Sequence, residues 1–286
     1  MNKGILFFVF ALALAIPAVA NQENQLCRGF LPSNNMSYPV VEGPAAAMAK
    51  AKFDEVLDRV HAVYGPIIRG MGATLKISRK WTDPTVNAYA DRNGSTWEIV
   101  MFGGFARHPA VTADGFMAVA CHELGHHIGG APKFGSDWAS VEGESDYWAN
   151  LKCLRRIFES DDNKKIVDGM TVDPIAVRDC KAQHTSQQDE YVCIRATMAA
   201  KSLALVLAED DPSKPPPQLD TPDKSEVGST NGSHPAGQCR LDTLFEASLC
   251  KVPFAQDVSQ ANYKTGSCFT PNDTRGARSR CWFKPN

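Results

Sequence analysis

Apolar and polar positions repeat with two different periods along the first half of the chain. Between residues 43 and 68, apolar side chains recur every three or four positions, which predicts an amphipathic helix that Gly65 and Pro66 end. The segment 73–81 alternates as a strand does. Two more strand-like runs within residues 85–104 flank Asn93-Gly94, a pair typical of a tight hairpin. This half therefore predicts a helix followed by a small sheet.

Helical spacing dominates the second half. A helix over residues 112–130 is predicted to begin at the capping residue Thr112 and to end at two glycines. Further helices are predicted at Asp137–Phe158, at 191–210 and, after a Pro- and Ser-rich loop at 210–233, at 239–250. Strands followed by helices indicate an α+β fold in which the helix at 112–130 packs beside the sheet.

The first twenty residues resemble a secretory signal peptide. Lys3 precedes an apolar run over residues 4–16, and Ala18-Val19-Ala20 is a small-residue cleavage site before Asn21. A membrane anchor is the alternative, but the run is shorter than the ~20 residues of a comfortable span. We therefore expect a secreted or periplasmic protein without a stable membrane anchor after cleavage.

Length and charge limit the organisation and the partners. The 286 residues divide into the signal peptide at 1–20, one domain at 21–250 and a Cys-containing tail at 251–286, which we expect to pack on the domain. The exposed loop at 210–233 belongs to the domain. With a formal net charge of -2 and no long basic stretch, we do not expect nucleic acid as a partner.

Nine cysteines in an exported chain indicate an oxidising compartment, and the odd number leaves at least one thiol unpaired or paired with another chain. Cys239 and Cys250 cannot bridge each other, because a helix of this length holds them about 16 Å apart. Cys250 is therefore expected to pair with Cys268 or Cys281.

The other cysteines have alternative partners. Cys180 and Cys193 flank a short polar segment and are expected to pair, unless one of them reaches Cys153. Cys121 lies within an apolar helix, and we expect it to be the unpaired, buried thiol.

The stretch "CHELGHHIGG" carries the candidate chemistry. His122 and His126 are four residues apart on the helix at 112–130, so both imidazoles face the same side and reach one cation. Glu123 lies between them in sequence and is placed to act as a base on metal-bound water. His127 is rotated about 100° from His126 and is predicted to be an outward polar residue rather than a ligand.

A catalytic zinc ion usually takes three protein ligands and keeps one position for water. On the next helix, Glu142 and Asp146 are four residues apart and face the same side. Glu142 is predicted to be the third ligand, with Glu144 as the competing residue that should point elsewhere. Asp146 is predicted to accept a hydrogen bond from the non-ligating nitrogen of His122 or His126. One Zn²⁺ per chain is expected.

Four separated motifs resemble the CAAX prenyl protease and HtpX-like metallopeptidases, which are gluzincins. They are the Asn-Ala strand, the HExxH helix, the Glu-x-x-x-Asp pattern that begins at Glu142, and the late "SHPAGQCR" stretch. The resemblance implies the ligands His122, His126 and Glu142, with Glu123 as base. It also implies an active-site role for His234, a substrate-binding strand edge at Asn87 and Ala88, and a place for Arg240 near the reacting carbonyl. The alternative for Arg240 is a structural pairing with an acid.

This chain departs from the family in four respects. It has no spanning helices after the signal peptide, and it carries Ser145 where the family usually has alanine. The spacer of fifteen residues between His126 and Glu142 is unusually compact, and the Cys-containing tail has no counterpart.

These features predict a zinc-dependent metalloendopeptidase that acts on exported or unfolded proteins through a zinc-activated water. The substrate would be a protein or peptide extended along the Asn87–Ala88 edge. Two other functions compete with this one. They are a zinc hydrolase of a non-peptide amide, such as a cell-wall crosslink, and a zinc-stabilised binding module without catalysis.

Overall fold

The computed structural model describes residues 29–40, 48–134, 138–269 and 275–285. Within these residues, three strands form one sheet in the order β1-β3-β2, with β1 parallel and β2 antiparallel to the central β3. The strands are β1 (Thr74–Lys80), β2 (Ala88–Asn93) and β3 (Thr96–Phe102). The helices are α1 (Lys50–Gly70), α2 (Gly103–Arg107), α3 (Ala113–Ile128), α4 (Glu142–Trp148), the π-helix η1 (Ala149–Cys153), α5 (Leu154–Phe158), α6 (Asn163–Asp168), α7 (Pro174–Gln183), α8 (Gln187–Asp210) and α9 (Gly237–Leu249).

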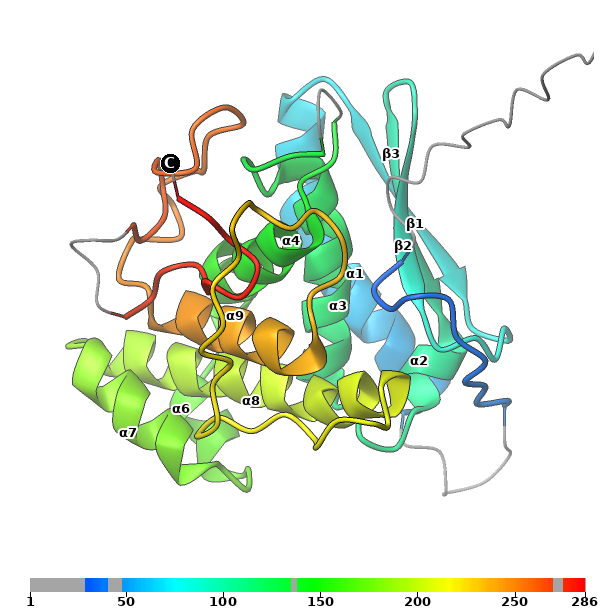
Figure 1. Ribbon diagram of the computed structural model, residues 1–286. Coiled ribbons are helices and arrows are strands. Elements are labelled where there is room, and N and C mark those ends of the chain that lie inside the picture. The colour runs from blue at the N-terminus through cyan, green and yellow to red at the C-terminus, as the bar shows by residue number, and fades with distance from the viewer. Residues whose placement is uncertain (1–28, 41–47, 135–137, 270–274, 286) are drawn as a thin grey trace, which may run out of the picture.

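Helix α3 lies in the middle of the molecule, between the sheet and the other helices (Figure 1). It begins at Thr112, whose side chain accepts a hydrogen bond from the amide of Gly115, as its sequence predicts. Every residue from Gly115 to Ile128 is buried. The predicted α+β class, with a small sheet beside this helix, is confirmed. Because neighbours surround α3, each polar side chain on it needs a partner inside the protein.

Two predicted helix boundaries were wrong. Helix α1 continues through Pro66 to Gly70, because Tyr64 and Ile68, on either side of the proline, both pack into the core. This burial offsets the hydrogen bond that proline cannot donate. The helix predicted at Asp137–Phe158 begins instead at Glu142, and Asp137 lies outside the described residues. Ser140 is tied to the end of α3 by its amide, which donates to the carbonyl of His126, so the chain stays extended there.

Other elements follow the pattern of the sequence more closely. The β2–β3 hairpin turns at Gly94 with φ +59°, and the long apolar helix α8 starts one turn earlier than predicted, at a Ser186 cap. Helix α8 is the one described helix long and apolar enough to span a membrane. However, 67% of its apolar window is buried in the molecule, as expected of a core helix. The short helices α2, α6 and α7 were not predicted.

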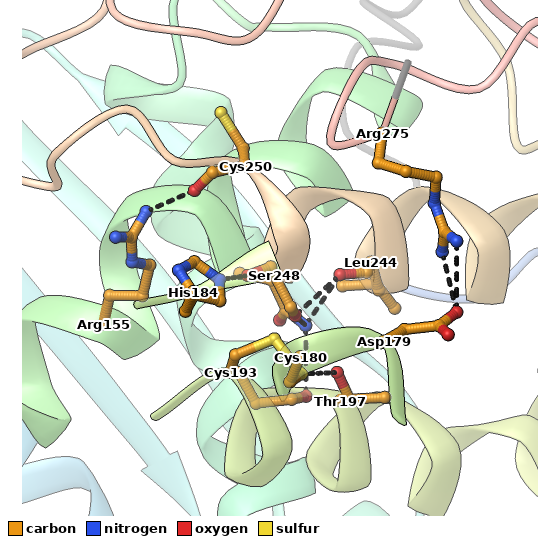
Figure 2. Close-up of a disulfide and its surroundings, with 12 residues drawn as sticks. Arg155, Asp179, Cys180, His184, Cys193, Thr197, Leu244, Ser248, Cys250 and Arg275 are labelled. Atoms are coloured by element: carbon orange, nitrogen blue, oxygen red, sulfur yellow. Dashed lines mark hydrogen bonds and ion pairs between the residues drawn. A yellow bond between two sulfur atoms is a disulfide. The ribbon is translucent and has the colours of Figure 1, made fainter. Parts of the chain in front are cut away.

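In the part of the chain that the structure describes, four disulfides join neighbouring elements, which fits an extracellular protein. The predicted Cys180–Cys193 pair links α7 to α8 (Figure 2). Around it, Thr197 contacts Cys180, and a ring nitrogen of His184 lies 3.1 Å from the carbonyl oxygen of Ser248 on α9. These contacts hold the three helices together.

The prediction that Cys121 is unpaired was wrong. Helix α3 packs against η1, which brings the Cα atoms of Cys121 and Cys153 to 5.6 Å, and the two form a disulfide. The remaining bridges are Cys239–Cys281 and Cys250–Cys268. Eight cysteines are thus paired, and the ninth, Cys27, lies outside the described residues, as does the predicted signal peptide.

The tail contacts α4 directly. Glu144 points away from His122 and His126, as predicted, and is held by two hydrogen bonds from Arg278 of the tail. Burial raises the pKa of Glu144 to about 7 in spite of the opposing charge of Arg278. Next to it, the Trp282 ring lies against Gly143, where an added Cβ would come within 2.2 Å of the ring. The tail therefore fixes the outer face of the helix that carries Glu142.

We expect the substitution Arg278→Leu to destabilise the protein by about 3–5 kcal/mol, because it leaves the Glu144 carboxyl buried without its partner. Arg280→Leu is the matched control, since Arg280 pairs with an exposed carboxylate of Glu226, and its loss should cost less than about 1 kcal/mol. Denaturant unfolding under non-reducing conditions measures both. Equal losses in the two variants would contradict this account.

Candidate metal centre

Three side chains with metal-ligand chemistry meet between α3 and α4. His122 and His126 lie on the same side of α3, and Glu142 is the first residue of α4. One potential ligand atom from each lies within 4.8 Å of the others. Nε2 of His122 is 3.2 Å and Nε2 of His126 is 3.7 Å from the Glu142 carboxylate. The three predicted ligands therefore form a group of the size that holds one metal ion.

Gly125 allows this approach. A Cβ at this position would come within 2.9 Å of Cα and 3.0 Å of the carbonyl oxygen of Ser145, so a larger residue would push α4 away. Gly125 lies one residue before His126, and Ser145 lies between Glu142 and Asp146 in the next helix. The glycine inside the HExxH motif thus sets the separation of the two helices that carry the ligands.

Both histidines are oriented through their second nitrogen. Nδ1 of His122 lies 2.7 Å from the carboxylate of Asp146. Of the two histidines that Asp146 was predicted to orient, His122 is therefore the one. Nδ1 of His126 lies 2.8 Å from the carbonyl oxygen of Ser140. Since an acceptor oxygen faces each Nδ1, that nitrogen carries a proton, and Nε2 is the nitrogen left to ligate a cation. This is the tautomer that a metal ligand requires.

Asp146 is itself held by Arg240, which reaches it from α9. Nε of Arg240 donates to one carboxylate oxygen at 2.7 Å, and a terminal nitrogen donates to the other at 2.9 Å. Burial alone would raise the pKa of Asp146, but the charges of Arg240 and then His122 hold it well below its usual range. Arg240 is thus the partner of an acid, one of its two predicted roles, and it also donates to the carbonyl of Phe30.

Several polar atoms at this centre have no hydrogen-bond partner among the described residues. They are both carboxylate oxygens of Glu123, Nε2 of His122 and of His126, and Oε2 of Glu142. All of these residues are buried. Burying polar atoms without partners is costly, so the group fits a cation together with a water molecule. Two imidazoles and one carboxylate are a donor set that suits Zn²⁺.

The electrostatics define the charge of each residue at the centre. Burial lowers the pKa of His122, but the Asp146 carboxylate raises it to about 9, so without a cation this ring is protonated at pH 7 and metal binding would release a proton from it. Burial lowers the pKa of His126 to about 4, so its ring is neutral at pH 7 and able to ligate. Although burial raises the pKa of Glu142, the neighbouring His126 and the contact with His122 lower it to about 2, and it is a carboxylate. Burial raises the pKa of Glu123 to about 8, and a cation in the centre would lower it.

His234 reaches the same centre from the segment before α9. Its Nε2 lies 3.4 Å from Oε2 of Glu142 and donates a hydrogen bond of 2.7 Å to the carbonyl of Gly29. Burial lowers the pKa of His234, so the ring is neutral at pH 7. The structure therefore places His234 beside the metal-ligand group, and its predicted active-site role stays a prediction.

The predicted substrate-binding edge is occupied by the chain itself. The side-chain amide of Asn87 accepts from the backbone amide of Leu31 and donates to the carbonyl of Leu31, both at 3.0 Å. The amide of Phe30 donates to the carbonyl of Ala88 at 2.9 Å. Residues 29–31 carry no motif, so nothing in the sequence indicated that they lie at this edge.

The prediction that His127 faces outward was wrong. The residue is 1% exposed, and its ring is stacked between those of Trp97 and Trp138. Arg92 of β2 donates to its Nδ1 at 3.0 Å. The sheet covers this face of α3, which helical periodicity alone does not reveal. His127 is not part of the metal-ligand group.

Comparisons with protein-family models, with curated proteins and with solved structures find no match for this chain. The function is therefore inferred from the geometry of the centre, and the resemblance to HtpX-like metallopeptidases stays a prediction. A second group, Asp223 with Cys239 and Cys281, contains a disulfide and so offers no free thiolate.

We expect Glu142→Ala to lower the bound metal sharply from one ion per chain, because it removes one of three ligands. Glu144→Gln should keep the full metal content, since Glu144 faces Arg278 instead. Elemental analysis of the folded, gel-filtered proteins measures this. If Glu144→Gln lost its metal and Glu142→Ala kept it, Glu144 rather than Glu142 would be the third ligand.

We expect Asp146→Asn to weaken metal binding by about 10–100-fold, because His122 loses the carboxylate that orients it. Competition with a chromophoric chelator measures the affinity. The control is Asp168→Asn, an exposed residue paired with Lys164, which should bind metal as the wild type does. Unchanged affinity in Asp146→Asn would refute the orienting role.

Proposed function

We propose that this protein is a zinc-dependent metalloendopeptidase that hydrolyses peptide bonds of exported or unfolded proteins. The observation that carries the proposal is the buried group of unpartnered atoms on His122, His126, Glu142 and Glu123. Three of these residues would hold the ion, and the fourth would be the base. When bound, Zn²⁺ supplies Lewis-acid chemistry that makes a water molecule nucleophilic at neutral pH.

The chain's own residues would do the rest. Glu123 would take a proton from the attacking water and deliver it to the leaving nitrogen. His234 is neutral and donates from Nε2, so it would stabilise negative charge on the carbonyl oxygen of the substrate. Asp146, with its charge fixed by Arg240, would keep His122 in the ligating tautomer.

Two observations favour this function over its rivals. A purely structural metal site has no need of Glu123, yet this residue is fully buried with both oxygens unpartnered. A hydrolase of non-peptide amides has no need of an edge that binds a peptide backbone. Asn87 binds both backbone groups of one residue, which matches a peptide irrespective of its side chain.

We expect Glu123→Gln to keep one zinc ion per chain and to lose about 10²–10⁴-fold in peptide hydrolysis, because it removes the base without removing a ligand. Cleavage of unfolded casein and of a quenched peptide library measures the activity. Glu55→Gln, exposed on α1, is the control and should match the wild type. Cleavage by Glu123→Gln at the wild-type rate would refute the assignment, as would activity that survives complete chelation of the metal.

A further inference from the structure

Residues 29–31 contact every residue that we assign to holding a peptide. The carbonyl of Gly29 accepts from His234, the amide of Phe30 donates to Ala88, and both backbone groups of Leu31 bind Asn87. In addition, Arg240 donates to the carbonyl of Phe30. Three consecutive residues are thus held through their backbone, as a bound peptide would be.

The bond between Gly29 and Phe30 lies beside the metal-ligand group. Nε2 of His234, which donates to the Gly29 carbonyl at 2.7 Å, is also 3.4 Å from the carboxylate of Glu142. The Phe30 ring lies edge-on to that of His122, with 5.1 Å between centroids. The proposed donor for the reacting carbonyl therefore contacts this peptide unit directly, and the Phe30 side chain contacts one of the candidate ligands.

The side chains on either side of this bond match their surroundings. Phe30 is 1% exposed, and its ring packs against that of Phe105. The guanidinium carbon of Arg240 lies 4.1 Å from the centre of the Phe30 ring. Gly29 has φ +104°, and a Cβ there would come within 2.6 Å of the Asn87 side chain and 2.7 Å of the Ala88 carbonyl. A glycine before the bond and an aromatic residue after it are what this site accepts.

The chain remains anchored beyond the bond. Ser37 pairs antiparallel with Thr85, the Tyr38 amide donates to the Pro84 carbonyl at 2.9 Å, and Arg107 donates to the Tyr38 carbonyl at 2.9 Å. This segment, blue in Figure 1, lies alongside the sheet. A break before Phe30 would leave all these contacts in place.

We propose that the metal centre hydrolyses the Gly29–Phe30 bond of its own chain, so that Phe30 becomes the new amino terminus. This inference rests on the proposed function. One water is consumed: its oxygen bonds to the Gly29 carbonyl carbon, the C–N bond breaks, and Glu123 delivers the proton to the Phe30 nitrogen. The products are a carboxylate on Gly29 and an amine on Phe30.

The number of cysteines agrees with this cleavage. The sequence has nine, and the product that begins at Phe30 lacks Cys27, which leaves eight. These eight are the ones that form the four disulfides. The processed chain would carry no unpaired thiol.

Intact mass and amino-terminal sequencing of the zinc-loaded wild type and Glu123→Gln test the proposal. The wild type should begin at Phe30, and the variant should keep Gly29 and residues before it. The rate should be unchanged on tenfold dilution, as for an intramolecular reaction. A Glu123→Gln chain that begins at Phe30 would overturn the proposal, as would a rate that falls in proportion to dilution.

Failure of this proposal is distinguishable from failure of the proposed function. A wild type that cuts an added peptide but keeps its own Gly29–Phe30 bond would overturn only the self-cleavage. A zinc-loaded wild type that cuts neither would overturn both.

A matched glycine pair provides a second test. Gly29→Ala should slow the cleavage by about tenfold or more, because alanine disfavours a positive φ and its methyl group would displace the bond from His234. Gly228→Ala, where an added Cβ meets nothing within 4 Å, should cleave at the wild-type rate. Thermal unfolding of both variants confirms that they are folded. Wild-type cleavage by Gly29→Ala would contradict the proposal.

Discussion

The fully buried carboxylate of Asp146 connects the parts of the structure on which the metal centre depends. It lies on α4, orients His122 of α3 through one oxygen, and binds Arg240 of α9 through both. Arg240 in turn holds the carbonyl of Phe30. A buried charge is tolerated only with such partners, so each of these contacts requires the others. The site is therefore a property of four chain segments together.

The first turns of α4 show how one short helix serves three purposes. Glu142, Glu144 and Asp146 are all buried, yet each faces a different group. Glu142 faces the two histidines, Glu144 faces Arg278 of the tail, and Asp146 faces Arg240. The tail, with its disulfides to α9, thus fixes α4 from the side opposite the metal centre. Its contribution to the site is to hold Glu142 in position.

The edge at Asn87 and Ala88 links the fold to the proposed chemistry. Its backbone-binding groups are fully engaged by Phe30 and Leu31, so a peptide added from outside must displace these residues to use the same contacts. Under the proposed function, residues 29–31 would therefore compete with every external substrate for this edge. Activity on other proteins would then depend on how firmly residues 29–31 stay bound.

The sequence by itself determined the features that depend on local geometry. Helical spacing places His122 with His126 and Glu142 with Asp146, and the capping residue Thr112 and the turn at Gly94 set the ends of their elements. It also placed Glu144 away from the histidines. Periodicity assigns residues to one face of a helix without saying what covers that face.

Only the tertiary structure decided what lies against each face. The sheet buries His127, η1 brings Cys153 to Cys121, and α9 brings Arg240 to Asp146. Residues 29–31 reach the centre from more than ninety positions before His122, with no motif to mark them. These pairings join segments far apart in the chain, and they are selected by burial and by the partners that buried polar groups require.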